Sequence, residues 1–203
     1  ASAWMSDAVK KRCLVVRKAG TRLVNRMTAP EETEVDFADR YPLLTITQET
    51  IDEISALFPD PIDGSCFRYN LLLRGCTTRD ENRMERFRVG EFIGRGVKPC
   101  ERCPTVNVDQ MTGAINTMIL ATLRAHPAFV NDKHEVIVGE NAIVEHEGTI
   151  TVGDPVEVLQ WREHGWDREY DDRPRHIDAS SILGADRSRG LRRFFQRILP
   201  PWF

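Results

Sequence analysis

The sequence predicts a β-rich α+β domain whose core is a partly closed β-barrel. Two observations lead to this fold class: many short runs of β-branched residues separated by glycine-containing turns, and only two stretches with good helical periodicity. An α+β chain with so many strands favours a barrel-like sheet. A length of 203 residues allows one substantial core, with or without a tail.

The expected strands are short runs rich in valine, isoleucine and threonine. They are residues 12–17, 43–46, 67–73, 86–93, 134–138, 141–145, 149–152 and 155–159. The polar stretch 21–36 has no periodicity and is expected to be a loop.

Two helices are expected from apolar residues at helical spacing. The first covers residues 48–58, where Thr47 can cap the amino end and Pro59 helps to end the helix. The second covers residues 114–125 and ends before Pro127.

The character of the chain changes after the last expected strand, so residues 1–160 are predicted to form the folded domain and 161–203 an irregular tail. Residues 161–188 are dense in charged side chains and predict a linker. The segment 190–203 is amphipathic, with arginines away from its apolar face. Contact of residues 188–203 with a membrane surface is one interpretation. Docking on the protein's own core or on a partner is more common for such helices, and we favour it.

Composition excludes several classes of protein. A net charge of −3 gives no reason to expect nucleic acid as a partner, because phosphate binding needs a basic face. No apolar run approaches the length of a membrane-spanning helix, and no signal peptide is visible. Five cysteines without a secretory signal favour free thiols in a reducing compartment. We therefore expect a cytoplasmic protein, or a mitochondrial one if a targeting segment precedes Ala1.

The segment 99–113, PCERCPTVNVDQMTG, contains a CxxC pair, which has three common meanings. In a structural zinc site, Cys66 and Cys76 would have to supply the other two ligands, but their ten-residue spacing is unlike a zinc knuckle. A thioredoxin-like redox pair expects a helix after the motif, whereas Pro104 and β-branched residues follow here. The third meaning is thiolate ligation of another soft metal, and it fits best. Arg102 and Lys98 would then lower the pKa of the ligating thiol.

Four motifs in order resemble the MOSC domain family. They are FADRYPLLTITQETIDEI, FRYNLLLRG, CERCPTVNVDQMTG and EGTITVGDPVEVL, and the resemblance runs from about Trp4 to Leu159. MOSC domains form the C-terminal domains of molybdenum cofactor sulfurases and the mitochondrial amidoxime-reducing components. The resemblance implies a MOSC-type barrel over residues 1–160 and binding of the molybdenum cofactor, a molybdenum-molybdopterin complex.

The resemblance also implies roles for individual residues. The second cysteine of the family's CxRC element binds molybdenum, which makes Cys103 both the metal ligand and the catalytic residue. Arg68 and Asn70 match the family's FRPN arginine and asparagine near the pterin and the metal. Tyr69 stands where the family usually has proline, which loosens the geometry of that strand without removing a polar contact. A thiolate suits this soft metal, and the planar fork of arginine suits oxygens of the pterin and phosphate.

Three further residues complete the predicted site. Arg102 and Asp109 match positions that shape the loop around the metal, and Thr47 falls near a hydroxyl-bearing position that lines the cofactor. Asp109 has an equally good alternative, which is to pin the DQMTG turn through backbone hydrogen bonds.

The resemblance implies three functions. The leading hypothesis is an oxidoreductase domain that reduces an N-hydroxylated or other N–O small-molecule substrate, with electrons from a separate haem or flavin protein. The second is the cofactor-binding domain of a molybdenum cofactor sulfurase, in which pyridoxal phosphate would belong to a separate upstream domain. The third is a non-catalytic cofactor carrier. It is motivated by the basic N-terminal segment that amidoxime-reducing relatives carry and that this chain is expected to lack.

Overall fold

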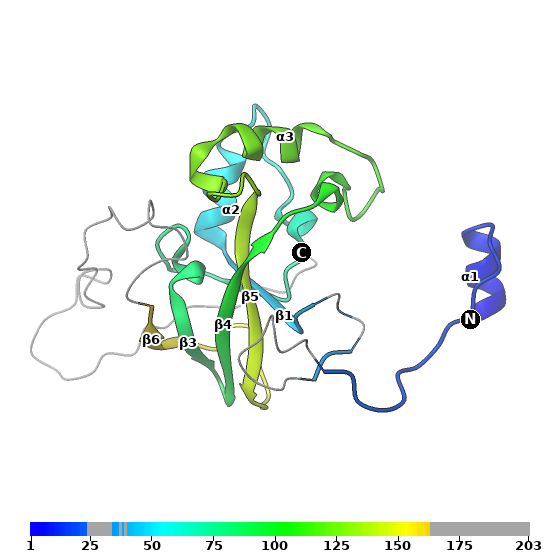
Figure 1. Ribbon diagram of the computed structural model, residues 1–203, viewed down its shortest axis with the longest axis horizontal. Coiled ribbons are helices and arrows are strands. Elements are labelled where there is room, and N and C mark those ends of the chain that lie inside the picture. The colour runs from blue at the N-terminus through cyan, green and yellow to red at the C-terminus, as the bar shows by residue number, and fades with distance from the viewer. Residues whose placement is uncertain (24–33, 37, 39, 163–203) are drawn as a thin grey trace, which may run out of the picture. The chain divides into compact units, whose positions relative to one another are not determined.

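The structure is a computed structural model that describes residues 1–23, 34–36, 38 and 40–162 (Figure 1). The chain divides into two compact units, Ala1–Arg40 and Tyr41–Phe203. The first unit contains helix α1 (Ser2–Ala8), and the second contains the sheet. The predicted C-terminal amphipathic segment, and the predicted linker beyond Arg162, lie outside the described residues.

One mixed sheet of six strands forms the framework of the second unit, in the order β2-β1-β5-β4-β3-β6. The strands are β1 (Leu43–Thr47), β2 (Leu71–Leu73), β3 (Met84–Val89), β4 (Phe92–Glu101), β5 (Ile137–His146) and β6 (Val156–Trp161). The helices of this unit are α2 (Gln48–Ser55) and α3 (Met118–Ala125), with short 3-10 helices η1 (Gly64–Phe67), η2 (Asp80–Asn82), η3 (Pro104–Asn107) and η4 (Pro127–Phe129). Strand β1 pairs in parallel with β2, and the other described pairings are antiparallel.

The sheet is curled into a half-barrel. Leu73 of the edge strand β2 and Val156 of the opposite edge strand β6 belong to one buried cluster, together with Phe87 of β3 and Ala142 of β5. Strands at opposite edges of a flat sheet could not share a core, so the sheet must curve around this cluster. The predicted partly closed barrel in a β-rich α+β domain is thereby confirmed.

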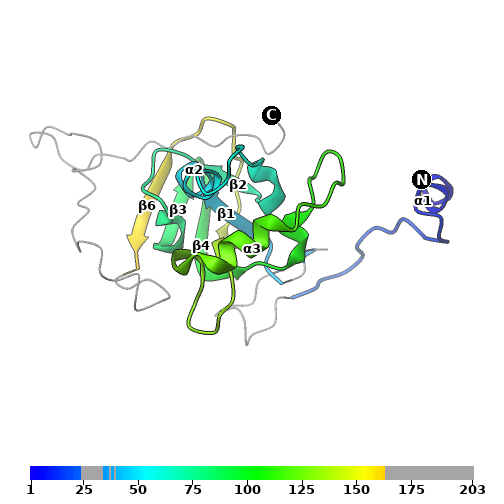
Figure 2. The same cartoon turned by 90° about the horizontal axis from the view of Figure 1, so that it is seen from above.

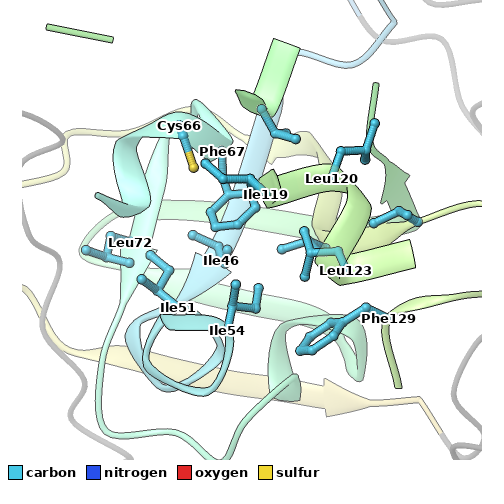
Figure 3. Packing of buried hydrophobic residues seen from close by; sticks show 13 residues of the cluster. Ile46, Ile51, Ile54, Cys66, Phe67, Leu72, Ile119, Leu120, Leu123 and Phe129 are labelled. Atoms are coloured by element: carbon cyan, nitrogen blue, oxygen red, sulfur yellow. The ribbon is translucent and has the colours of Figure 1, made fainter. Parts of the chain in front are cut away.

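The second buried cluster lies between the sheet and the helices. Successive side chains of a strand point to opposite faces, so Leu71 and Leu73 enter the first cluster while Leu72 enters the second. Figure 3 shows Leu72 and Ile46 of the strands packed with residues of α2 and α3. Figures 1 and 2 show that α2 and α3 lie together at one end of the sheet.

Two of the predicted strands are wrong. Residues 12–17 form no strand, and Leu14, Val15 and Val16 are exposed. Residues 149–152 are likewise irregular. A run of β-branched residues forms a strand only where a neighbouring strand pairs with it, and no described strand pairs with either stretch, although Ile150 packs on the first buried cluster.

Glycines shift the boundaries of other predicted strands. The predicted strand 86–93 is a hairpin, because Gly90 with φ +54° turns β3 into β4. Conversely, Gly139 with φ +77° lies inside β5 and joins the two predicted strands 134–138 and 141–145. A Cβ atom there would lie 2.9 Å from the carbonyl oxygen of Thr45, so this close approach needs glycine.

The two predicted helices are confirmed with shorter bounds. Helix α2 begins where predicted, and Thr47 accepts a hydrogen bond from the backbone N–H of Thr50 as its N-cap. Helix α3 begins at Met118 rather than residue 114, because the preceding residues form a turned loop in which Ile115 bridges to Val108. Among residues 1–23, 34–36, 38 and 40–162, no helix combines the length and apolar character needed to cross a membrane.

Candidate functional site

Cys103 lies at the end of β4, where the chain leaves the sheet. It is the N-cap of η3, which Pro104 starts, and its backbone is extended. The thiol is free and exposed, and its Sγ lies 3.0 Å from Oγ1 of Thr105. The hydrogen bond from this hydroxyl is the main cause that lowers the pKa of Cys103, and the positive charge of Arg102 adds to it. The predicted metal ligand is therefore an accessible cysteine whose thiol loses its proton more readily than that of an ordinary cysteine.

Arg102 joins two segments that are distant in the sequence. Its guanidinium donates hydrogen bonds to the carbonyl oxygen of Phe67 and, at 3.0 Å, to Sγ of Cys100. Its backbone N–H donates to the carbonyl oxygen of Val136 at 2.7 Å. The side chain also lies over the Phe67 ring, 5.3 Å from the ring centre. Arg102 thus holds the loop that carries Cys103 against η1, as predicted for a residue that shapes this loop.

Lys98 does not take the part expected of it. It forms an ion pair with Glu101 and is not among the causes that lower the pKa of Cys103. Lys98 lies within β4, whereas Cys103 lies beyond the end of that strand, and the carboxylate of Glu101 holds the ammonium group of Lys98.

Arg68 closes η1 and lies in an unexpected backbone conformation. With φ +54° it is in the left-handed region, and its side chain is exposed. No described residue forms an ion pair or a side-chain hydrogen bond with it. The prediction of a strand over 67–73 is therefore wrong for its first half, because η1 occupies Phe67 and β2 begins only at Leu71.

Asn70 pairs with the backbone of β1. Its N–H donates to the carbonyl oxygen of Leu44 at 2.9 Å, and its Oδ1 accepts the N–H of Leu44 at 2.8 Å. The side chain therefore completes the start of the β1–β2 ladder, and only its Nδ2 remains for a ligand.

Three of the predicted residues lie together. Helices η1 and η3 are in contact, Arg68 ends the first, Cys103 begins the second, and Arg102 links them. The structure thus brings the accessible thiol of Cys103 and the backbone of Arg68, an exposed residue whose side chain has no partner among the described residues, to the junction of two short helices.

Asp109 fixes the loop after η3. Its Oδ1 accepts hydrogen bonds from the N–H of Met111 at 2.9 Å and from the N–H and hydroxyl of Thr112 at 2.7 and 2.8 Å. These bonds, those to Thr112 foremost, lower the pKa of Asp109. The contacts match the structural alternative predicted for this residue.

Thr47 is fully buried at the start of α2. Besides capping the helix, its hydroxyl donates to Oε2 of Glu81 at 2.8 Å, and the hydroxyl of Thr50 does the same at 3.0 Å. The hydroxyl of Thr47 therefore belongs to a buried hydrogen-bond network with Thr50 and Glu81. Its predicted contact with a cofactor stays a prediction.

Glu81 is the centre of that network and only 1% exposed. Burial raises its pKa to about 7, against the lowering effect of the two threonine hydroxyls. Its Oε1 has no hydrogen-bond partner in the part of the chain that the structure describes. Sequence reasoning missed this residue, because an acidic side chain in a charged loop usually lies in solvent.

The remaining cysteines do not assemble a metal site with Cys103. All five are free, and burial raises the pKa of Cys66 to about 12. Among residues 1–23, 34–36, 38 and 40–162, no group of three or more His, Cys, Asp or Glu side chains could hold a metal ion. A zinc site of four protein ligands is therefore not formed by these residues.

Two residues of η3 were missed by the sequence analysis. Thr105 is the hydrogen-bond partner of Cys103, and Asn107 is a buried polar residue that lines a cavity of about 370 Å³. A hydroxyl two residues after the cysteine was the available signal for Thr105. No signal identified Asn107, because its burial depends on α3 packing from a later part of the chain.

The fold and the site define a class of protein: a curled-sheet domain that presents one accessible cysteine, beside an arginine, on the loop after a central strand. Comparison with known proteins agrees with this class. The family model described as MOSC domain matches residues 32–157, and the chain belongs to the MOSC domain family.

Over the aligned regions, about a quarter of the residues are identical between this chain and curated relatives. Human mitochondrial amidoxime-reducing component 1 is 24% identical over 132 residues, which cover 62% of this chain and 39% of the relative. Molybdenum cofactor sulfurase of Oryza sativa subsp. japonica is 25% identical over 142 residues, 61% of this chain and 17% of the relative. Human mitochondrial amidoxime reducing component 2 is 24% identical over 168 residues, 77% of this chain and 50% of the relative. The chain thus spans half or less of the length of these relatives.

Proposed function

We propose that this chain binds the molybdenum cofactor through Cys103 and reduces N-hydroxylated or other N–O substrates, with electrons from a separate haem or flavin protein. The observation that carries the proposal is the free, exposed thiol of Cys103, with its pKa lowered, at the junction that also holds Arg68. Membership of the MOSC family and the names of the relatives support the cofactor.

The donor set of this structure fits such a group. One thiolate is a soft ligand that molybdenum accepts, and a metal that brings its own sulfur and oxygen ligands needs only one from the protein. The described residues contain no group of three or more His, Cys, Asp or Glu side chains that could hold a metal ion without such a cofactor. The guanidinium of Arg68, which has no partner among the described residues, suits oxygens of the pterin or its phosphate, because its planar fork donates paired hydrogen bonds.

The residues around Cys103 would each have a separate task. Cys103 would hold the metal, and the hydroxyl of Thr105 would stabilise negative charge on its sulfur. Arg102 would hold the loop in place through its bonds to Phe67 and Cys100, and its positive charge would stabilise the thiolate of Cys103. When bound, the cofactor would supply a metal centre that exchanges an oxygen atom and two electrons with the substrate.

The cofactor contacts would depend on Arg68 more than the sequence predicted. Oδ1 of Asn70 is occupied by Leu44, so this residue can offer only its Nδ2. The hydroxyl of Thr47 is occupied by Glu81. Both would support the site mainly by holding β1, β2 and α2 in place.

A sulfurase-type function is the second candidate. The rice relative, whose name is molybdenum cofactor sulfurase, matches this chain at an identity similar to that of the amidoxime-reducing components. In that case the domain would present the cofactor to a separate pyridoxal-phosphate domain.

A reduction assay separates the candidates. Cofactor-loaded chain, reduced methyl viologen as electron donor and an N-hydroxylated amidine as substrate should give the amidine with the wild type and none with Cys103→Ala. If loaded wild type shows no turnover above the Cys103→Ala background, the oxidoreductase proposal fails and the sulfurase or carrier role takes its place.

A further inference from the structure

Met111, Ile115 and Met118 form an exposed apolar ridge on the loop between η3 and α3. Their exposed fractions are 76%, 72% and 59%, and they are three of the four large apolar residues that are exposed in the described part of the second unit. The loop is held by the hydrogen bonds that Asp109 accepts and by the bridge between Val108 and Ile115. A structured loop that presents a contiguous apolar surface to solvent indicates an interaction surface.

A cavity of about 370 Å³ adjoins this ridge, between the loop after α2 and the segment from η3 to α3. Met118 belongs to both, and Phe58, Cys66 and Ile119 continue the apolar lining. Cys66 and Ile119 are part of the second buried cluster, and Figure 3 shows them at the same end of it. The ridge and the cavity therefore form one apolar groove that runs from solvent towards the core.

Asn107 supplies an unused hydrogen-bond donor to this groove. The residue is 8% exposed and lines the cavity, and its Oδ1 accepts the backbone N–H of Leu120 at 2.9 Å. That bond fixes which end of the carboxamide is the nitrogen. Its Nδ2 has no hydrogen-bond partner among the described residues, although buried polar groups usually have one. A donor left over in a buried side chain indicates an occupant with an acceptor atom, such as a backbone carbonyl oxygen.

The charged side chains of the groove are all acidic. Of the described residues that line the cavity, Asp60, Asp63 and Asp109 carry carboxylates and none carries a cationic side chain. Asp63 and Asp109 accept hydrogen bonds within their own turns, whereas Asp60 is exposed and no described residue bonds its side chain. An apolar groove with an acidic rim favours an occupant that is apolar and positively charged.

The predicted amphipathic segment 190–203 of the same chain has this complementary composition. Phe194, Phe195 and Ile198 fall on its apolar face at helical spacing. From Arg187 onward the sequence contains five arginines and no acidic residue. Aromatic and arginine side chains are also enriched in the cores of protein interfaces.

The connection between the groove and this segment is long enough. Arg162 is held to the sheet by a hydrogen bond to the carbonyl oxygen of Gly96 at 2.8 Å. Residues 163–189 separate it from the segment, and a stretch of that length can span up to about 90 Å. A domain of about 120 residues has a radius of gyration of only about 14 Å. Two sites joined by one chain meet at effective concentrations of about a millimolar, so even a weak contact between them is populated.

We propose that residues 190–203 dock into this groove of the same chain. Phe194 and Phe195 pack on the ridge and on the apolar lining of the cavity, and the arginines lie beside Asp60 at the rim. Because Cys103 is the N-cap of η3, whose last residue lines the cavity, the docked segment borders the candidate site. This docking goes beyond the proposed function and does not depend on it, since it needs neither cofactor nor substrate.

Methionine-methyl NMR of the full, metal-free chain tests the docking. Met111 and Met118 report on the ridge, and substitution of each by leucine assigns its resonance. Met84, which is 1% exposed in the first buried cluster, is the internal control for the fold. The double variant Phe194→Asp, Phe195→Asp should shift both ridge resonances towards those of solvent-exposed methionine and leave that of Met84 unchanged.

A matched control and a peptide sharpen the test. Tyr170→Asp alters an aromatic residue outside the segment and should shift none of the three resonances. A peptide of residues 187–203 should bind the double variant at least about tenfold more tightly than the wild type, whose own segment competes for the groove. Adding Asp60→Lys to the double variant should weaken peptide binding about fivefold. Asp132→Lys, which changes an exposed carboxylate outside the cavity, should not.

Three results would count against the inference. Unshifted ridge resonances in the double variant, or equal affinities of the peptide for wild type and double variant, would show that the segment does not occupy the groove and is left for a membrane surface or a partner protein. A wild-type spectrum that turns into that of the double variant on dilution from about 1 mM to about 20 μM would place the segment of a second copy in the groove. Docking within one chain would then be wrong.

Discussion

Replacing Glu81 by glutamine should remove a pH dependence of stability. A carboxyl whose pKa is higher in the folded state than in the unfolded state binds its proton more tightly when folded. The free energy of unfolding therefore falls as pH rises from the unfolded-state pKa to the folded-state pKa. For Glu81 the gap runs from the ordinary value of 4.5 to about 7 in the folded chain. This gap corresponds to about 3 kcal/mol, which is an upper figure for a fully buried group.

The variant tests the burial of this side chain directly. Glutamine keeps an oxygen for the hydroxyls of Thr47 and Thr50, and it stays neutral at every pH. In urea denaturation, Glu81→Gln should match the wild type within about 1 kcal/mol at pH 5 and exceed it by up to about 3 kcal/mol at pH 8. Glu147→Gln, which alters an exposed carboxyl, should give no such gain. A Glu81→Gln variant that is less stable than the wild type at pH 8 would refute the reasoning.

Three further substitutions test the packing around the site. Thr47→Val, which loses the helix cap and a buried hydrogen bond, should lower the free energy of unfolding by about 1–3 kcal/mol, and Thr47→Ser should recover most of it. Thr105→Val should slow alkylation of Cys103 by iodoacetamide at pH 7 about two- to tenfold, because the pKa of the thiol rises when the hydroxyl is removed. An unchanged rate would show that the hydroxyl of Thr105 does not lower the pKa of Cys103. Gly96→Ala should destabilise the chain by about 1–3 kcal/mol in the same urea assay, since its Cβ would lie 2.6 Å from the carbonyl oxygen of Met84, and wild-type stability would contradict that close approach.

Local patterns predicted the parts of the fold that local chemistry decides. The threonine before a run of helical periodicity identified the N-cap of α2, and β-branched runs identified β1 and β6. Residues 12–17 carry an equally good strand pattern but have no neighbour to pair with among the described residues. A pattern in one segment cannot report whether another segment will lie beside it.

In the candidate site, too, local sequence predicted some features, whereas others depend on distant segments of the chain. The motif around Cys103 predicted a metal-binding thiolate, and the structure adds that this thiol is exposed at the start of η3. The left-handed conformation of Arg68 was not predicted, and the pairing of Asn70 with Leu44 depends on a contact across 26 residues that no single segment encodes. The buried carboxyl of Glu81 was likewise invisible, because its two hydroxyl partners lie more than thirty residues earlier in the chain.

The most direct test of the central claim is the molybdenum and pterin content of purified chain after expression with a supply of the cofactor. Wild type and Cys100→Ala should retain the cofactor, whereas Cys103→Ala should lose it by about tenfold or more, because removal of the metal's protein ligand costs at least as much as removal of a supporting contact. Cys103 is exposed, so alanine leaves the core intact, and circular dichroism should confirm the fold. Equal cofactor in Cys103→Ala and wild type would contradict the claim that this thiol holds the metal.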